Sequence, residues 1–95
     1  MNQTTKKWRI SDETVYITIL QMCAAAGLDG NVRPEDVAME IQRDDWQSIL
    51  KRVRLFGKQL AQSGDIVILR KGKIANPDDV KGMIRLQISE KFLGV

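Results

Sequence analysis

Residues 44–70 read DDWQSILKRVRLFGKQLAQSGDIVILR. Apolar side chains first recur every three or four residues and then become nearly consecutive toward the end of this stretch. The first pattern predicts an amphipathic helix over residues 45–63, and the second predicts a β-strand over residues 66–70. The apolar face of the predicted helix consists of Trp46, Ile49, Leu50, Val53, Phe56, Gly57 and Leu60.

Local signals mark the ends of this helix and one position inside it. Gly64 is placed to end the helix, and Asp44 with Gln47 three residues later resembles a capping box at its start. Gly57 within the helix costs about 1 kcal/mol relative to alanine. We therefore expect another element to pack closely against Gly57.

The chain after the strand has the pattern of a hairpin. The sequence turns at residues 71–73 and again at 76–79, where glycine, proline and aspartate gather. A second strand is predicted where apolar residues alternate with polar ones, because this is the period of a half-buried strand. The apolar positions are Ile84, Leu86 and Ile88. Two antiparallel strands joined by a loop of about a dozen residues fit this pattern best.

The N-terminal half predicts two more helices. Ser11 is placed to cap a helix that ends at Gly27. A short strand is expected around Val32, and Pro34 suits the first position of a helix over residues 34–42.

The order of these elements predicts an α+β fold. A hairpin is only marginally stable alone, so it must cover the helices. The compact solution is a winged helix-turn-helix, with a three-helix cluster and a small antiparallel sheet of two or three strands. We expect a flexible lead-in over residues 1–7, the winged-helix domain over 8–88 and a tail over 89–95.

Composition excludes several classes of function. The 95 residues include no His and one Cys, which removes the usual general base, the commonest metal ligand and an internal disulfide. The carboxylate pairs at 44–45 and 78–79 are interpreted as helix-cap and turn residues. We therefore expect no catalytic site, no metal and no cofactor.

The basic residues before the first helix do not form a secretory signal, because Asp12 and Glu13 follow them. We expect a cytoplasmic protein with no membrane partner.

The net charge of +3 conceals an uneven distribution. Residues 10–45 carry eight acidic and two basic side chains, whereas residues 46–73 carry seven basic and one acidic side chain. Such polarisation has two readings: a polyanion-binding surface, or a solvated face of mixed charge.

The first functional hypothesis is DNA binding through the third helix and the wing. In winged helix-turn-helix proteins the third helix enters the major groove and the wing meets the backbone. Basic and amide side chains supply phosphate contacts and base-edge hydrogen bonds. The candidate residues are Gln47, Lys51, Arg54 and Lys58 on the helix, with Gln62 on the same stripe, and Arg70, Lys71, Lys73 and Arg85 on the wing.

The second hypothesis is a protein-interaction or dimerisation module without nucleic-acid binding, since fold does not fix function. Leu55 is apolar within the basic stripe, the first helix has a wide apolar arc, and Phe92 and Leu93 lie in the tail. These residues provide a homodimer surface or a groove for a protein partner. The alternative is that they complete a small core.

Most of the chain resembles a known family. The resemblance rests on Trp46, Val53-Arg54, Leu60-Ala61, Gly64-Asp65-Ile66, Arg70-Lys71-Gly72, Asn76-Pro77 and Lys81-Gly82-Met83-Ile84-Arg85-Leu86. Over residues 11–88 the chain is similar to domain of unknown function thirty-two fifty-three, a family of small, mainly bacterial proteins. The family usually has a proline after Lys-Gly, where this chain has Met83. The resemblance implies the winged-helix fold and assigns no activity.

Overall fold

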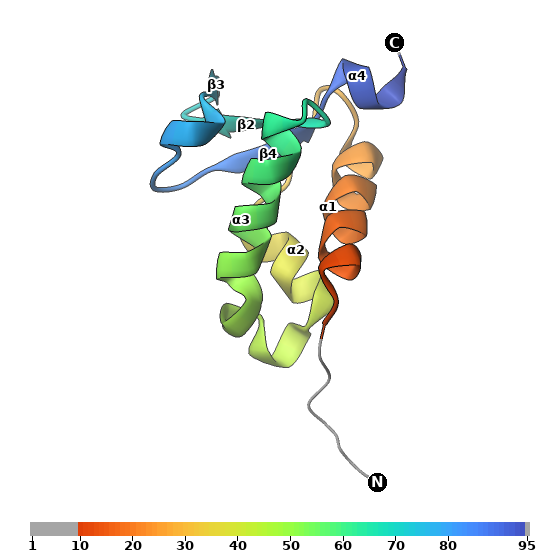
Figure 1. Ribbon diagram of the computed structural model, residues 1–95, viewed down its shortest axis with the longest axis vertical. Coiled ribbons are helices and arrows are strands. Elements are labelled where there is room, and N and C mark those ends of the chain that lie inside the picture. The colour runs from red at the N-terminus through yellow and green to blue at the C-terminus, as the bar shows by residue number, and fades with distance from the viewer. Residues whose placement is uncertain (1–9, 95) are drawn as a thin grey trace, which may run out of the picture.

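The computed structural model describes residues 10–94. Figure 1 shows three helices packed together, with a small sheet beyond the C-terminal end of the green helix. The helices are α1 (Asp12–Ala26), α2 (Pro34–Ile41) and α3 (Gln47–Gln62), and a short α4 (Glu90–Leu93) follows the sheet. The strands are β2 (Ile66–Arg70), β3 (Lys73–Ala75) and β4 (Arg85–Ile88), and the 3-10 turns are η1 (Arg43–Asp45) and η2 (Pro77–Asp79). The prediction of an α+β, winged-helix-like fold is confirmed.

Both ends of α1 form as the sequence predicts. Ser11 has an extended backbone, and its hydroxyl oxygen accepts a 3.1 Å hydrogen bond from the Thr14 N–H. Gly27 ends the helix with φ 82°, a conformation that favours glycine. The acidic Asp12 and Glu13 lie in the first turn, against the positive end of the helix dipole.

The predicted capping box at Asp44 is wrong. The N-cap of α3 is Trp46, whose helical backbone (φ −62°, ψ −28°) differs from the extended backbone of Ser11. Asp44 lies in the 3-10 turn η1, so α3 begins two residues later than predicted. Ser48 instead donates a 2.8 Å hydrogen bond to the Asp45 carbonyl and holds the turn onto the helix. Asp44, which the sequence analysis predicted as the cap of this helix, therefore belongs to the short turn that connects α2 and α3.

The sheet has the strand order β3-β2-β4, and both pairs are antiparallel. The predicted strand around Val32 is reduced to a single bridge, in which Val32 and Leu86 exchange backbone hydrogen bonds of 2.9 and 2.7 Å. The predicted long loop contains the additional strand β3. Lys71 and Gly72, with φ 55° and 79°, make the tight turn between β2 and β3. We call residues 70–84, from the last residue of β2 to the residue before β4, the wing.

The core lies where α1, α2, α3 and the inner face of the sheet meet. Alternate residues of β2 and β4 point into it, as the period of two predicts. Gly57 of α3 lies against Leu86, and the close packing expected there is confirmed. The buried apolar side chains are Val15, Ile19, Cys23, Val37, Ala38, Ile49, Val53, Phe56, Leu60, Ile66, Ile68, Ile84, Leu86 and Ile88.

The C-terminal segment forms a helical turn fastened to the end of α3. Ser89 donates a 2.6 Å hydrogen bond to the Gly64 carbonyl, and Lys91 donates one of the same length to the Ser63 carbonyl. Among residues 10–94, no helix is both long enough and apolar enough to cross a membrane.

Candidate nucleic-acid interface

The predicted residues of α3 lie along its outer side. Gln47 and Lys51 are exposed, whereas Arg54 and Lys58 are half-buried. The half-buried pair lines a groove of about 240 Å³ between α3 and the wing, which Lys51 also borders. Val80 and Ile84 form part of its opposite wall. The wing therefore covers part of the basic stripe of α3.

Arg54 of α3 and Arg70 of β2 converge on one glycine of the wing. The Arg54 Nη2 donates a 3.0 Å hydrogen bond to the Gly82 carbonyl. The Arg70 guanidinium lies 3.7 Å from the position that a Cβ on Gly82 would occupy. Gly82 has φ 75°, which favours glycine at this position. The guanidinium groups of Arg54 and Arg70 thus lie at the same glycine, although they come from α3 and β2. This places the basic side chains of α3 next to those of the wing.

The tip of the wing concentrates positive charge. Arg70 and Lys73 are directly opposite each other across β2 and β3, so their side chains project to the same face. Lys71 lies between them in the turn, and all three side chains are exposed. Like charges placed opposite each other destabilise a strand pair. A bound polyanion would relieve that repulsion.

Arg85 is separated from the other predicted residues. It pairs with Leu69 and projects outward, because Ile84 and Leu86 on either side of it point into the core. Its Nη1 donates a 3.2 Å hydrogen bond to the Asn31 Oδ1. The structure therefore brings Arg54 and Arg70 together at Gly82, leaves Gln47 at the opposite end of α3, and places Arg85 on the outer face of the sheet.

Carboxylates lie at both ends of the basic stripe. Gln62, which the sequence placed on that stripe, donates a 2.7 Å hydrogen bond to Asp78 of η2. At the other end, the exposed Asp44 and Asp45 precede Gln47, with Trp46 between them. Positive charge is therefore concentrated at the middle of α3 and the wing, where Lys81 of the wing is exposed as well. Sequence reasoning missed Lys81 and the contact with Asp78, because both depend on how the wing folds back over α3.

The opposite side of α3 is fastened to α1. Arg52 donates 2.7 and 2.8 Å hydrogen bonds to the Asp12 carboxylate and the Ile10 carbonyl. Tyr16 stacks on Phe56 with ring centroids 4.6 Å apart, and its hydroxyl donates a hydrogen bond to Gln59. These contacts fix the orientation of the basic side of α3 relative to the rest of the domain.

Among residues 10–94, three titratable groups have shifted pKa values: hydrogen bonding to Asp36 raises the pKa of Arg33, and the pKa values of Asp36 and Cys23 are shifted as well. Hydrogen bonds from the Arg33 side chain lower the pKa of Asp36, and the positive charge of Arg85 lowers it further. Burial raises the pKa of the Cys23 thiol to about 12, which favours the unreactive thiol form. Within residues 10–94, no group of three His, Cys, Asp or Glu side chains is placed to hold a metal ion.

Comparison with known proteins decides the family. A family model described as "Protein of unknown function (DUF3253)" matches residues 12–89. The chain belongs to this family. The DUF3253 match confirms the family that the sequence resembles, and it spans all three main helices and all three strands. No curated protein matches the chain.

Proposed function

We propose that the protein binds nucleic acid, duplex DNA in the first instance, through the middle of α3 and the tip of the wing. The observation that carries the proposal is the convergence of Arg54 and Arg70 on Gly82. It makes the cations of α3 and of the wing one continuous surface, with Lys51, Lys58, Lys71, Lys73 and Lys81 around the two arginines.

The arrangement favours contacts to phosphates over contacts to base edges. Residues 46–64 include no Asp or Glu, so the middle of α3 attracts phosphate without a competing carboxylate on the helix. Asp44 and Asp45, at the N-terminal end of α3, would repel phosphates on either side of a groove. Arg85, on the outer face of the sheet, is left out of the proposed interface. In this proposal the protein is a cytoplasmic binding protein and not an enzyme.

Salt dependence of binding to a labelled, mixed-sequence duplex tests the proposal. Fluorescence anisotropy across a salt series is expected to give a log–log slope of roughly −4 to −5, because four to six phosphate contacts release that many counterions. Lys51→Gln and Lys71→Gln are each expected to reduce the magnitude of the slope by about 1. Arg54 is not used, because it also holds the wing.

Lys91→Gln is the matched control, because it makes the same change in net charge on α4, away from the proposed surface. It is expected to leave the slope unchanged. Absence of binding at low salt would overturn the proposal. Equal slopes for all three variants would overturn the assignment to α3 and the wing.

An apolar hollow between α1 and α4 favours self-association as a second candidate function. Ile17, Leu20, Ala24 and Phe92 line it, and Ile17 and Phe92 are 44% and 42% exposed. A two-fold dimer through this surface is compatible with DNA binding, because it leaves α3 and the wing free.

Sedimentation velocity tests the dimer: the double variant Ile17→Ser with Phe92→Ser is expected to convert a dimer to a monomer. Ile74→Ser, on the wing, is the control, since Ile74 is 72% exposed and remote from the hollow. A wild-type chain that is monomeric at every concentration would exclude this candidate.

A further inference from the structure

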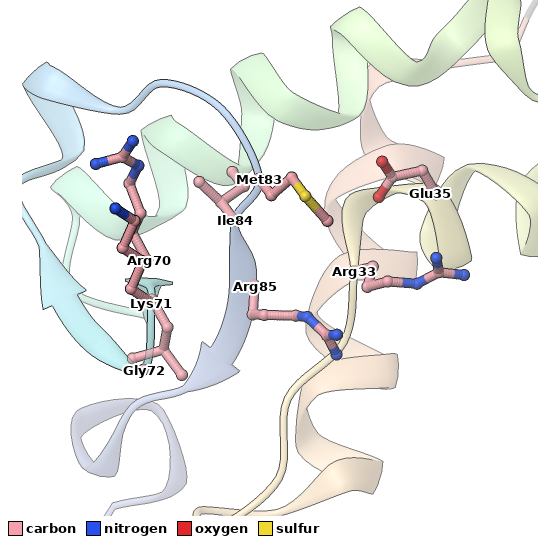
Figure 2. A pocket seen from close by; sticks show the side chains of 9 residues that line it. Arg33, Glu35, Arg70, Lys71, Gly72, Met83, Ile84 and Arg85 are labelled. Atoms are coloured by element: carbon pink, nitrogen blue, oxygen red, sulfur yellow. The ribbon is translucent and has the colours of Figure 1, made fainter.

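Hollows lie on both sides of the wing, and the cations around them are arranged differently. The larger hollow, of about 480 Å³, is lined by Arg33, Arg70, Lys71 and Arg85. Figure 2 shows Arg70 and Lys71 pointing away from Arg85, and Arg33 is paired with Asp36. These cations therefore do not converge on one ligand. The groove between α3 and the wing is different, because its cations and its apolar side chains border the same space.

This groove, of about 240 Å³, has an apolar floor. Ile68 and Ile84 are buried core residues that also line it. Leu55 of α3 and Val80 of the wing complete its apolar part. Leu55 is 49% exposed, so much of its side chain remains in contact with water. An apolar side chain that entered the groove from a partner would remove Leu55 from water, which favours association.

Three cations border the groove: Lys51, Arg54 and Lys58. Arg54 is held by the Gly82 carbonyl, whereas Lys51 and Lys58 form no ion pair among residues 10–94. The two lysines are about two helical turns apart on α3, and Leu55 lies between them in the sequence. No Asp or Glu of the described part of the chain lines the groove. An apolar centre thus has an uncompensated lysine toward each end.

Charge complementarity decides which occupant fits this arrangement. DNA phosphates would pair with the two lysines, but the phosphate backbone has no apolar side chain to fill the groove. An acidic amphipathic segment supplies carboxylates and an apolar side chain together, as in the recognition of such segments by grooves. The exposed Phe92 and Leu93 of a second copy would bring Lys91 with them, and this cation does not complement the lysines.

We propose that the groove binds a short acidic segment of another protein. One leucine or phenylalanine of the segment enters between Leu55 and Val80, and carboxylates on either side of it pair with Lys51 and Lys58. Arg54 stays on Gly82 and holds the wall of the groove in place. Because the two lysines also belong to the proposed DNA surface, such a partner displaces DNA; this last step rests on the proposed function.

The probe is a fluorescein-labelled synthetic peptide with glutamate on one face of a helix and leucine on the other. Anisotropy without DNA is expected to show saturable binding. Two control peptides carry serine in place of the leucines or glutamine in place of the glutamates. Each is expected to bind at least about tenfold more weakly, because it lacks either the apolar or the charged contacts. Equal binding of either control peptide would overturn the proposal.

Leu55→Ser locates the site. It is expected to weaken binding of the leucine peptide about tenfold through loss of the apolar contact and to leave the fold intact, because Leu55 lies outside the buried core. Ile74→Ser is the matched control: it makes the same kind of change at a side chain that is 72% exposed and lies opposite Leu69, on the outer face of the sheet. Unchanged peptide binding by Leu55→Ser would contradict the assignment.

Leu55→Ser also separates this inference from the proposed function. The variant is expected to keep the salt slope of the wild type on the labelled duplex, because Leu55 carries no charge. Saturating leucine peptide should release duplex from the wild type, and the same concentration should release less from Leu55→Ser. If the duplex binds and the peptide does not release it, the shared use of Lys51 and Lys58 is wrong. If the duplex never binds but the peptide does, the proposed function fails and the groove assignment stands.

Sedimentation velocity of the chain alone tests the other occupant. The proposal predicts that Leu55→Ser sediments as the wild type does. If the wild type self-associates and Leu55→Ser abolishes the association, the groove holds a second copy, and the proposal of a segment from another protein is wrong.

Discussion

Gly57 of α3 lies against Leu86 of β4 with room for one more carbon atom. A Cβ added to Gly57 would be 3.5 Å from both methyl groups of Leu86, which is ordinary van der Waals contact. The absence of a side chain at Gly57 therefore allows the helix and the sheet to approach closely, but the space is not completely filled.

Gly57→Ala is expected to stabilise the protein. The added methyl group fits, and alanine is favoured over glycine inside a helix by up to about 1 kcal/mol. Urea unfolding followed by circular dichroism should show an unfolding free energy higher by up to that amount. Gly57→Val is the contrasting variant: its two further methyl groups would collide with Leu86, so a loss of about 1–3 kcal/mol is expected. Destabilisation by alanine would show that the interface tolerates no added atom.

The central part of the fold could be predicted because its signals are local. The spacing of Ile49, Val53 and Phe56 predicts the buried face of α3, and these three side chains are buried. The alternation around Leu86 also predicts which residues of β4 face the core. The same alternation indicates that Arg85 points outward, away from the residues with which the sequence hypothesis grouped it.

The parts that could not be predicted depend on contacts between distant residues. Asp44 is a good capping residue by type, but the short α2–α3 connection places it in a 3-10 turn. The hydrogen bonds between Gln62 and Asp78 and between Arg54 and Gly82 join residues 16 and 28 positions apart. No periodicity in the sequence predicts such contacts. They decide how much of the basic stripe is exposed.

Cys23 is expected to be protected from thiol reagents in the folded protein. Its side chain is fully buried in the core, and its raised pKa of about 12 leaves almost no thiolate near neutral pH. Reaction with a chromogenic disulfide at pH 8 should therefore be roughly a hundredfold slower in buffer than in denaturing urea, because it requires opening of the core. Equal rates in the two conditions would show that the core does not shield Cys23.

The Arg33–Asp36 pair is expected to make stability depend on pH in the acid range. The pKa of Asp36 is lowered in the folded state from its ordinary 3.8, so its contribution is present above that value and is lost as the pH falls through the lowered pKa. Because both side chains are more than a third exposed, solvent screening limits the contribution to below about 1 kcal/mol.

Asp36→Asn tests this dependence in thermal unfolding between pH 7 and pH 2, an interval that brackets the ordinary pKa range of carboxyl groups. The variant should be slightly less stable than the wild type at pH 7, and the two curves should converge toward acid. Asp29→Asn removes one exposed carboxylate outside the ion pair and is the control for the loss of one negative charge. A stability difference for Asp36→Asn that persists at the acid end would assign the effect to lost hydrogen-bond geometry and not to charge.

Asp78→Asn is expected to strengthen DNA binding. Asp78 brings a negative charge beside the C-terminal half of α3 and accepts the hydrogen bond from Gln62. Asparagine removes the charge and keeps an acceptor oxygen, so the wing should stay in place. Removal of one repelling charge from a partly screened surface is worth about 0.7 kcal/mol, which corresponds to roughly threefold tighter binding at low salt.

Glu13→Gln makes the same change in net charge on α1, away from the wing, and should change the affinity by much less. Anisotropy titrations of both variants against the wild type measure the difference. If Asp78→Asn bound DNA no better than Glu13→Gln, the phosphates would not pass beside η2, and the DNA path would have to avoid the wing side of α3.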